Sequence, residues 1–129
     1  MRDRWLIDRT EDIDRRERLT STLGTLCDER LPEAAQSSDD SWPVHLDHCF
    51  RRLVYDHAVR DKWSDHIDSP FIDNATVPRL RSAVLAGKVA YLSGPGFAWR
   101  LQEQSMLWRG EMDGDDAEYV DPAKVPNHP

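Results

Sequence analysis

The chain has 129 residues, a length typical of one domain, and its net charge is −7. The five tryptophans argue against wholesale disorder, and the two cysteines, Cys27 and Cys49, are too few for a disulfide framework. No apolar run resembles a signal peptide or approaches the ~20 residues that cross a bilayer. We therefore expect a soluble, cytoplasmic protein that does not enter membranes.

The charge is distributed unevenly along the chain. Residues 1–44 carry seven arginines against eleven carboxylates, and residues 111–129 carry one lysine against six. Residues 45–110 carry nine cations against seven carboxylates and are therefore mildly basic. Because the overall charge is negative, nucleic acid is a disfavoured partner, and the charge pattern favours a protein partner instead.

The first predicted helix covers residues 10–35. Asp8 and Glu11 stand three residues apart, close to a capping box at a helix start. Apolar residues then recur at helical spacing: Ile13, Leu19, Leu23, Leu26, Cys27 and Leu31. Residues 1–9 are interpreted as an extended arm, in which the WLI run at 5–7 fits a short edge strand.

The second predicted helix covers residues 43–61, with Ser41 as its cap and Pro43 in its first turn. An ordered loop over 64–75 follows, because several of its residues are too apolar to remain in water. These residues are Ile67, Phe71 and Ile72.

The third predicted helix covers residues 77–92, with Thr76 as its cap. The fourth covers residues 96–109 and ends at Gly110. The sequence thus predicts an all-α domain over residues 1–110, a compact bundle of about four helices, followed by a flexible acidic tail over 111–129. The predicted core consists of Leu23, Leu26, Phe50, Leu53, Leu80, Val84, Leu101 and Trp108.

The stretch HLDHC at 45–49 holds the densest group of metal-ligand residue types. If it is helical, His45 and Cys49 lie one turn apart and are able to share one ion. A zinc or iron site needs further ligands, and His66 and Asp65 are the nearest candidates in sequence. The alternative is a helix edge on which the histidine is half-exposed and the cysteine is simply packed.

The HLDHC stretch also resembles a motif of the fungal ustiloxin-type oxidases. The resemblance covers these five residues, in one copy where that family has two, and we carry no activity over from it.

His57 is predicted to lie on the apolar face of the second helix. A buried imidazole needs hydrogen-bond partners for both nitrogens, so His57 is either a satisfied core residue or a general base that lines a pocket. No activated nucleophile stands beside it in the sequence. We therefore assign no catalytic residue beyond this candidate.

Cations on the second and third predicted helices could form a patch that binds phosphate or an acidic partner. The candidates are Arg51, Arg52, Arg79 and Arg81. The alternative is a solvated face whose charge is balanced by Asp47, Asp56 and Asp61.

Two classes of function follow. The first is a non-catalytic interaction protein, an adaptor, regulator or inhibitor that acts through charged helical surfaces. The second is a metal-binding protein or small metal-dependent enzyme built on HLDHC. The first predicted helix is also amphipathic enough to form a homodimer with a second copy of the chain.

Overall fold

The structure is a computed structural model that describes residues 2–111, with side chains from Glu11 onward. This part of the chain is entirely helical and contains no strand, which confirms the predicted all-α class. In chain order the elements are α1 (Arg2–Gly24), the π-helix η1 (Thr25–Arg30), α2 (Leu31–Ser37), α3 (Asp47–Val59), the 3₁₀-helix η2 (Trp63–Asp65), α4 (Phe71–Asn74), α5 (Val77–Ser93) and α6 (Pro95–Trp108).

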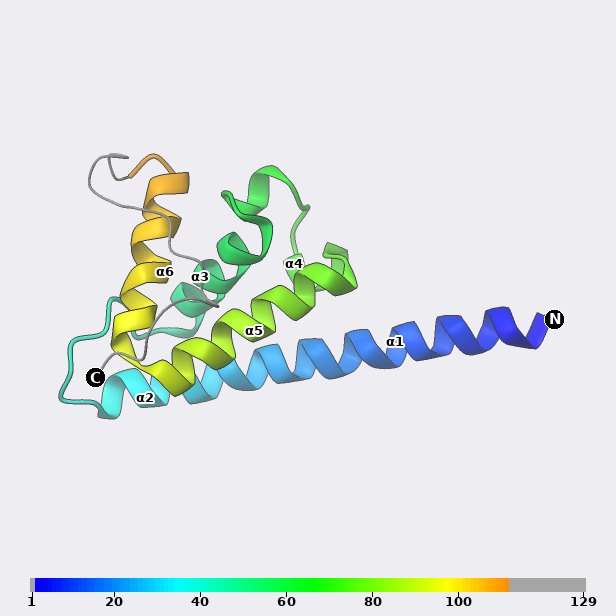
Figure 1. Cartoon of the computed structure of the whole chain (residues 1–129), viewed down its shortest axis with the longest axis horizontal. Helices are drawn as coiled ribbons and strands as arrows, with labels where there is room; N and C mark the ends of the chain where they lie inside the picture. Colours follow the sequence, from blue (N-terminus) through cyan, green and yellow to red (C-terminus); the bar gives the residue numbers. More distant parts are fainter. Residues whose placement is uncertain (1, 112–129) are drawn as a thin grey trace.

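Helix α1, η1 and α2 follow one another without a break from Arg2 to Ser37. The first predicted helix therefore begins too late, and the predicted edge strand at residues 5–7 is wrong because these residues belong to α1. Figure 1 shows that the N-terminal half of α1 extends well beyond the other helices. Gly24 does not end the helix, and the chain continues through a π turn that inserts extra backbone between α1 and α2.

Helix α5 lies against α1, α3 and α6, and its packing depends on small residues. Ala83, Ala86, Gly87 and Ala90 are buried along the face that meets these helices. A Cβ on Gly87 would lie 3.3 Å from Cδ1 of Leu26, so a larger residue here would need the Leu26 side chain to move by a few tenths of an ångström. The buried side of α5 thus combines four small residues with two larger core residues, Leu80 and Val84.

The predicted core is confirmed except at one residue. Seven of the eight predicted core side chains are buried, and Trp108 is only half-buried near the end of α6. Phe71 is 2% exposed and stacks on Tyr55 with a ring separation of 3.9 Å. Trp63 meets both rings edge-on. These contacts explain why the segment between α3 and α5 is ordered.

Helix α3 begins at Asp47, four residues later than the sequence predicts. Leu46 is extended, with φ −112° and ψ 153°, and buried Val44 holds the preceding segment against the core. Gln36 at the end of α2 donates a 2.9 Å hydrogen bond to the His45 carbonyl. These tertiary contacts hold residues 43–46 outside the helix.

Candidate interaction surface

Helix α5 begins as the sequence predicts. The Thr76 hydroxyl accepts a hydrogen bond from the Arg79 amide at 3.4 Å, and Pro78 occupies the first turn. Gly94, with φ 86°, separates α5 from α6. Helix α5 is therefore continuous from Val77 to Ser93. One of its faces packs against the bundle, and the opposite face is exposed to solvent.

Four of the six exposed residues of α5 lie at helical spacing along one stripe, which we call the α5 ridge: Arg81, Leu85, Lys88 and Leu92. At about 100° per residue, the four fall within an arc of roughly 60°. Leu85 is 58% exposed and Leu92 is 82% exposed, the two largest exposures among the described large apolar side chains. The ridge is thus a single stripe in which cations and leucines alternate.

The segment that contains the α5 ridge carries cations and no carboxylate. Between Asp73 and Glu103 the sequence contains no carboxylate, although it contains Arg79, Arg81, Lys88 and Arg100. Within the part of the chain that the structure describes, no ion pair involves Arg81 or Lys88. In a protein of net charge −7, this helix therefore presents cations that no described carboxylate neutralises.

The four predicted patch residues do not form one surface. Arg51 reaches across to η1, where its Nε and Nη2 donate to the two carboxylate oxygens of Asp28 at 2.8 and 2.6 Å. Its Nη1 donates to the Tyr55 hydroxyl at 2.7 Å, and these bonds raise the pKa of the guanidinium. Arg52 donates to the side-chain oxygen of Gln102 on α6. Both arginines therefore hold α3 to its neighbours.

Arg79 and Arg81, the other two predicted patch residues, lie on α5. Arg81 is exposed on the ridge, whereas Arg79 is half-buried on another side of the helix. The sequence prediction therefore included one ridge residue, and it missed the leucines. Leu85 and Leu92 stand seven residues apart, with Arg81 before them and Lys88 between them. This helical spacing was the signal in the sequence from which the ridge could have been predicted.

The HLDHC stretch is divided between a loop and a helix. His45 precedes α3 and is exposed, whereas Cys49 lies in its first turn and is half-buried. His66 lies beyond η2, where its Nε2 is 2.8 Å from Asp61 Oδ2, an interaction that lowers the pKa of the aspartate. Among the described residues, no three His, Cys, Asp or Glu side chains gather in a way that could hold a metal ion.

The other cysteine is chemically shielded. Cys27 in η1 is 0% exposed, and burial raises the pKa of its thiol to about 12. At neutral pH it is therefore a protonated, packed side chain rather than a nucleophile.

His57 is buried on α3, as its position on the apolar face predicts. The adjacent Asp56 is 0% exposed, although the sequence suggested a solvated residue. Its carboxylate accepts hydrogen bonds from Ser105 Oγ at 2.6 Å and from the Trp63 amide at 3.0 Å. Arg109 adds two more, from Nε at 2.6 Å and from its terminal nitrogen at 3.0 Å, and the pairing raises the pKa of Arg109.

The Asp56 cluster joins three elements. Asp56 lies on α3, Ser105 and Arg109 lie at the end of α6, and Trp63 opens η2. With four donors around one buried carboxylate, the cluster is saturated and leaves no acceptor for a substrate. Its role in this arrangement is to fix the end of α6 against α3.

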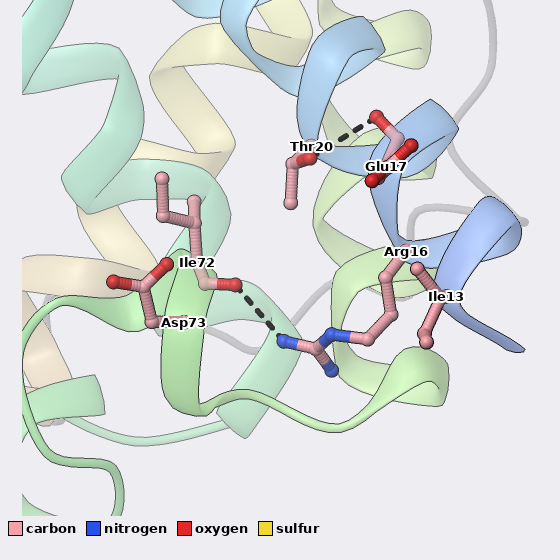
Figure 2. A pocket seen from close by; sticks show the side chains of 6 residues that line it. All are labelled: Ile13, Arg16, Glu17, Thr20, Ile72 and Asp73. Atoms are coloured by element: carbon pink, nitrogen blue, oxygen red, sulfur yellow. Dashed lines mark hydrogen bonds between the residues drawn. The ribbon is translucent and has the colours of Figure 1, made fainter. Parts of the chain in front are cut away.

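A groove of about 290 Å³ lies between α1 and α4. Figure 2 shows Arg16 reaching across it from α1, with Ile13, Glu17 and Thr20 on the same helix. The Arg16 guanidinium donates to the carbonyls of Ile72 at 3.0 Å and Ala75 at 2.6 Å, at the C-terminal end of α4. The cation of this groove is therefore engaged in holding α1 to α4.

Comparison of the chain with protein-family models, with curated proteins and with solved structures finds no match. No helix in the described part of the chain combines the length and apolarity that a membrane span requires.

Proposed function

We propose that the protein is a non-catalytic interaction protein, an adaptor, regulator or inhibitor, whose contact surface is the α5 ridge. The observation that carries the proposal is the exposure of Leu85 and Leu92 beside two cations that no described carboxylate neutralises. Other cations of the candidate patch serve internal contacts, so the α5 ridge is the better-placed basic surface for a partner.

The chemistry of the α5 ridge specifies its partner. Removing an exposed leucine side chain from water contributes about 1.5–3 kcal/mol when burial is complete. Carboxylates on a partner would complement Arg81 and Lys88. Such charge pairing also speeds the encounter of the two proteins and disfavours basic proteins. The ridge therefore fits an acidic protein segment that carries apolar side chains at a spacing of three to four residues, as in helix-on-helix recognition.

A charge-reversal experiment tests this proposal. The tagged full chain is compared with an Arg81→Glu/Lys88→Glu variant by quantitative mass spectrometry of the proteins each retains from the cells that make it. The matched control is Arg15→Glu/Arg18→Glu, which reverses two exposed cations on α1. Circular dichroism checks whether all three proteins are equally helical.

The proposal predicts a protein that the native chain and the α1 control retain and that the ridge variant loses at least tenfold. That protein should contain an acidic, apolar segment, and its retention should weaken as salt rises from 50 to 500 mM because the pairing is partly electrostatic. Equal retention by all three proteins would exclude the α5 ridge as the contact surface.

A further inference from the structure

We infer that the chain regulates its own contact surface, with the acidic segment over residues 111–121 docking on the α5 ridge when no partner is bound. This inference rests on the proposed function, because it assigns a competitor to the same surface. Two observations carry it: the complementary chemistry of the two segments, and the position of α6 relative to α5.

The composition of the segment matches the requirements of the α5 ridge. Residues 111–121 contain six carboxylates and no cation, and Tyr119 and Val120 place two apolar side chains among them. The ridge offers two cations and two exposed leucines in alternation. Each partner thus supplies what the other leaves unsatisfied in water.

The acidic segment is long enough to reach the α5 ridge. One residue, Gly94, separates α5 from α6, and α6 has fourteen residues, so Arg109 lies about 21 Å along the α6 axis from the end of α5. Figure 1 shows α6 leading away from that end of α5. Tyr119 and Val120 lie nine and ten residues beyond Gly110, a stretch that can span about 30 Å when extended. The apolar pair can therefore return to Leu92 and Lys88.

The tether gives this contact its regulatory effect. A segment joined to its site by a short linker has an effective concentration in the millimolar range. Even a weak cis contact would then occupy the α5 ridge for much of the time, and a partner in solution would have to compete with it. The apparent affinity for that partner then falls in proportion to the fraction of chains in which the α5 ridge is free.

Zero-length coupling with a carbodiimide in the full chain tests the inference. The reagent joins a lysine to a carboxylate that touches it, and the chain has three lysines: Lys62, Lys88 and Lys124. Lys88 lies on the ridge. Lys62 adjoins Trp63 and hence the Asp56 cluster at the end of α6, so it serves as the proximity control. The coupled residues are identified by peptide mass spectrometry at a protein concentration low enough to exclude dimers.

The inference predicts amide bonds between Lys88 and carboxylates of residues 113–121. An Arg81→Ser variant and a Leu85→Ser/Leu92→Ser variant both keep Lys88, and each should reduce this coupling at least fivefold while Lys62 coupling stays unchanged. Salt at 500 mM should have the same effect as Arg81→Ser.

Absence of any Lys88 coupling, or coupling that the ridge variants leave unchanged, would overturn the inference. Either result would leave the proposed function standing if the Arg81→Glu/Lys88→Glu variant still loses its partner. Conversely, Lys88 coupling with no partner lost in the charge-reversal experiment would show a cis contact whose surface serves no partner, which also overturns the regulatory inference.

Discussion

Asp56 illustrates what sequence reasoning misses at the scale of single residues. The sequence places His57 correctly on the buried face, but it offers Asp56 only as a carboxylate that balances the charge of a solvated face. The structure buries Asp56 completely because its partners, Ser105 and Arg109, lie 49 and 53 residues further along the chain. A helical projection of residues 45–61 contains no information about these partners.

We expect an Asp56→Asn substitution to destabilise the protein by about 3 kcal/mol, because removing one member of a buried ion pair leaves the other charge uncompensated. Urea denaturation followed by circular dichroism measures the change. An Asp28→Asn substitution removes the carboxylate of the more exposed pair with Arg51 and should cost no more than about 1 kcal/mol. Similar losses at both positions would contradict this interpretation of the Asp56 cluster.

The two cysteines should differ in reactivity. With iodoacetamide at pH 8, we expect one adduct per folded chain, at half-buried Cys49, because burial and a pKa of about 12 keep the Cys27 thiol protonated and inaccessible. Intact-mass measurement counts the adducts, and denaturation in urea should release the second. Rapid labelling of Cys27 in the folded chain would show that η1 opens locally.

At the scale of elements, most helices follow from capping residues and periodicity. The start of α5 at Val77, after its cap Thr76, and the end of α6 at Trp108 agree with the sequence prediction to within a residue. The start of α3 does not, because burial of Val44 outweighs the capping signal at Ser41 and Pro43. Boundaries that depend on tertiary contacts are therefore the ones that the sequence could not supply.

Arg16 provides the main polar contact between α1 and α4, and its replacement should loosen that junction. We expect Arg16→Lys to cost about 1.5 kcal/mol, because a lysine cannot present two N–H groups to the Ile72 and Ala75 carbonyls with the fixed geometry of a guanidinium. Urea midpoints measure the loss. Arg15→Lys, at the exposed neighbouring position, is the control and should leave the midpoint unchanged.

The α5 ridge should contribute little to the stability of the fold, although it is apolar. A Leu92→Ser substitution should change the free energy of unfolding by less than about 0.5 kcal/mol, because the side chain is 82% exposed. A Leu80→Ser substitution on the buried side of the same helix should cost several times more. Equal costs at the two positions would mean that Leu92 is already covered by another part of the chain.

At the scale of the whole molecule, the structure shows which cations form internal contacts and which are exposed, a distinction that composition alone does not provide. The sequence predicts a mildly basic middle between acidic ends, and the structure divides those cations into two groups. Arg51, Arg52 and Arg109 hold helices together, whereas Arg81 and Lys88 remain on the surface. Only the packing of the helices distinguishes the two groups, and the proposed function depends on that distinction.

Photo-crosslinking from the α5 ridge tests the central claim most directly. A benzoylphenylalanine in place of Leu92 is irradiated in the cells that make the protein, beside a control chain that carries it in place of exposed Leu46. The account predicts that position 92 captures a second protein through an acidic, apolar peptide distinct from residues 111–121 of the chain itself, that position 46 does not capture it, and that Arg81→Glu/Lys88→Glu abolishes the capture. Crosslinks of equal yield and identity at both positions would contradict the claim that the α5 ridge is the contact surface.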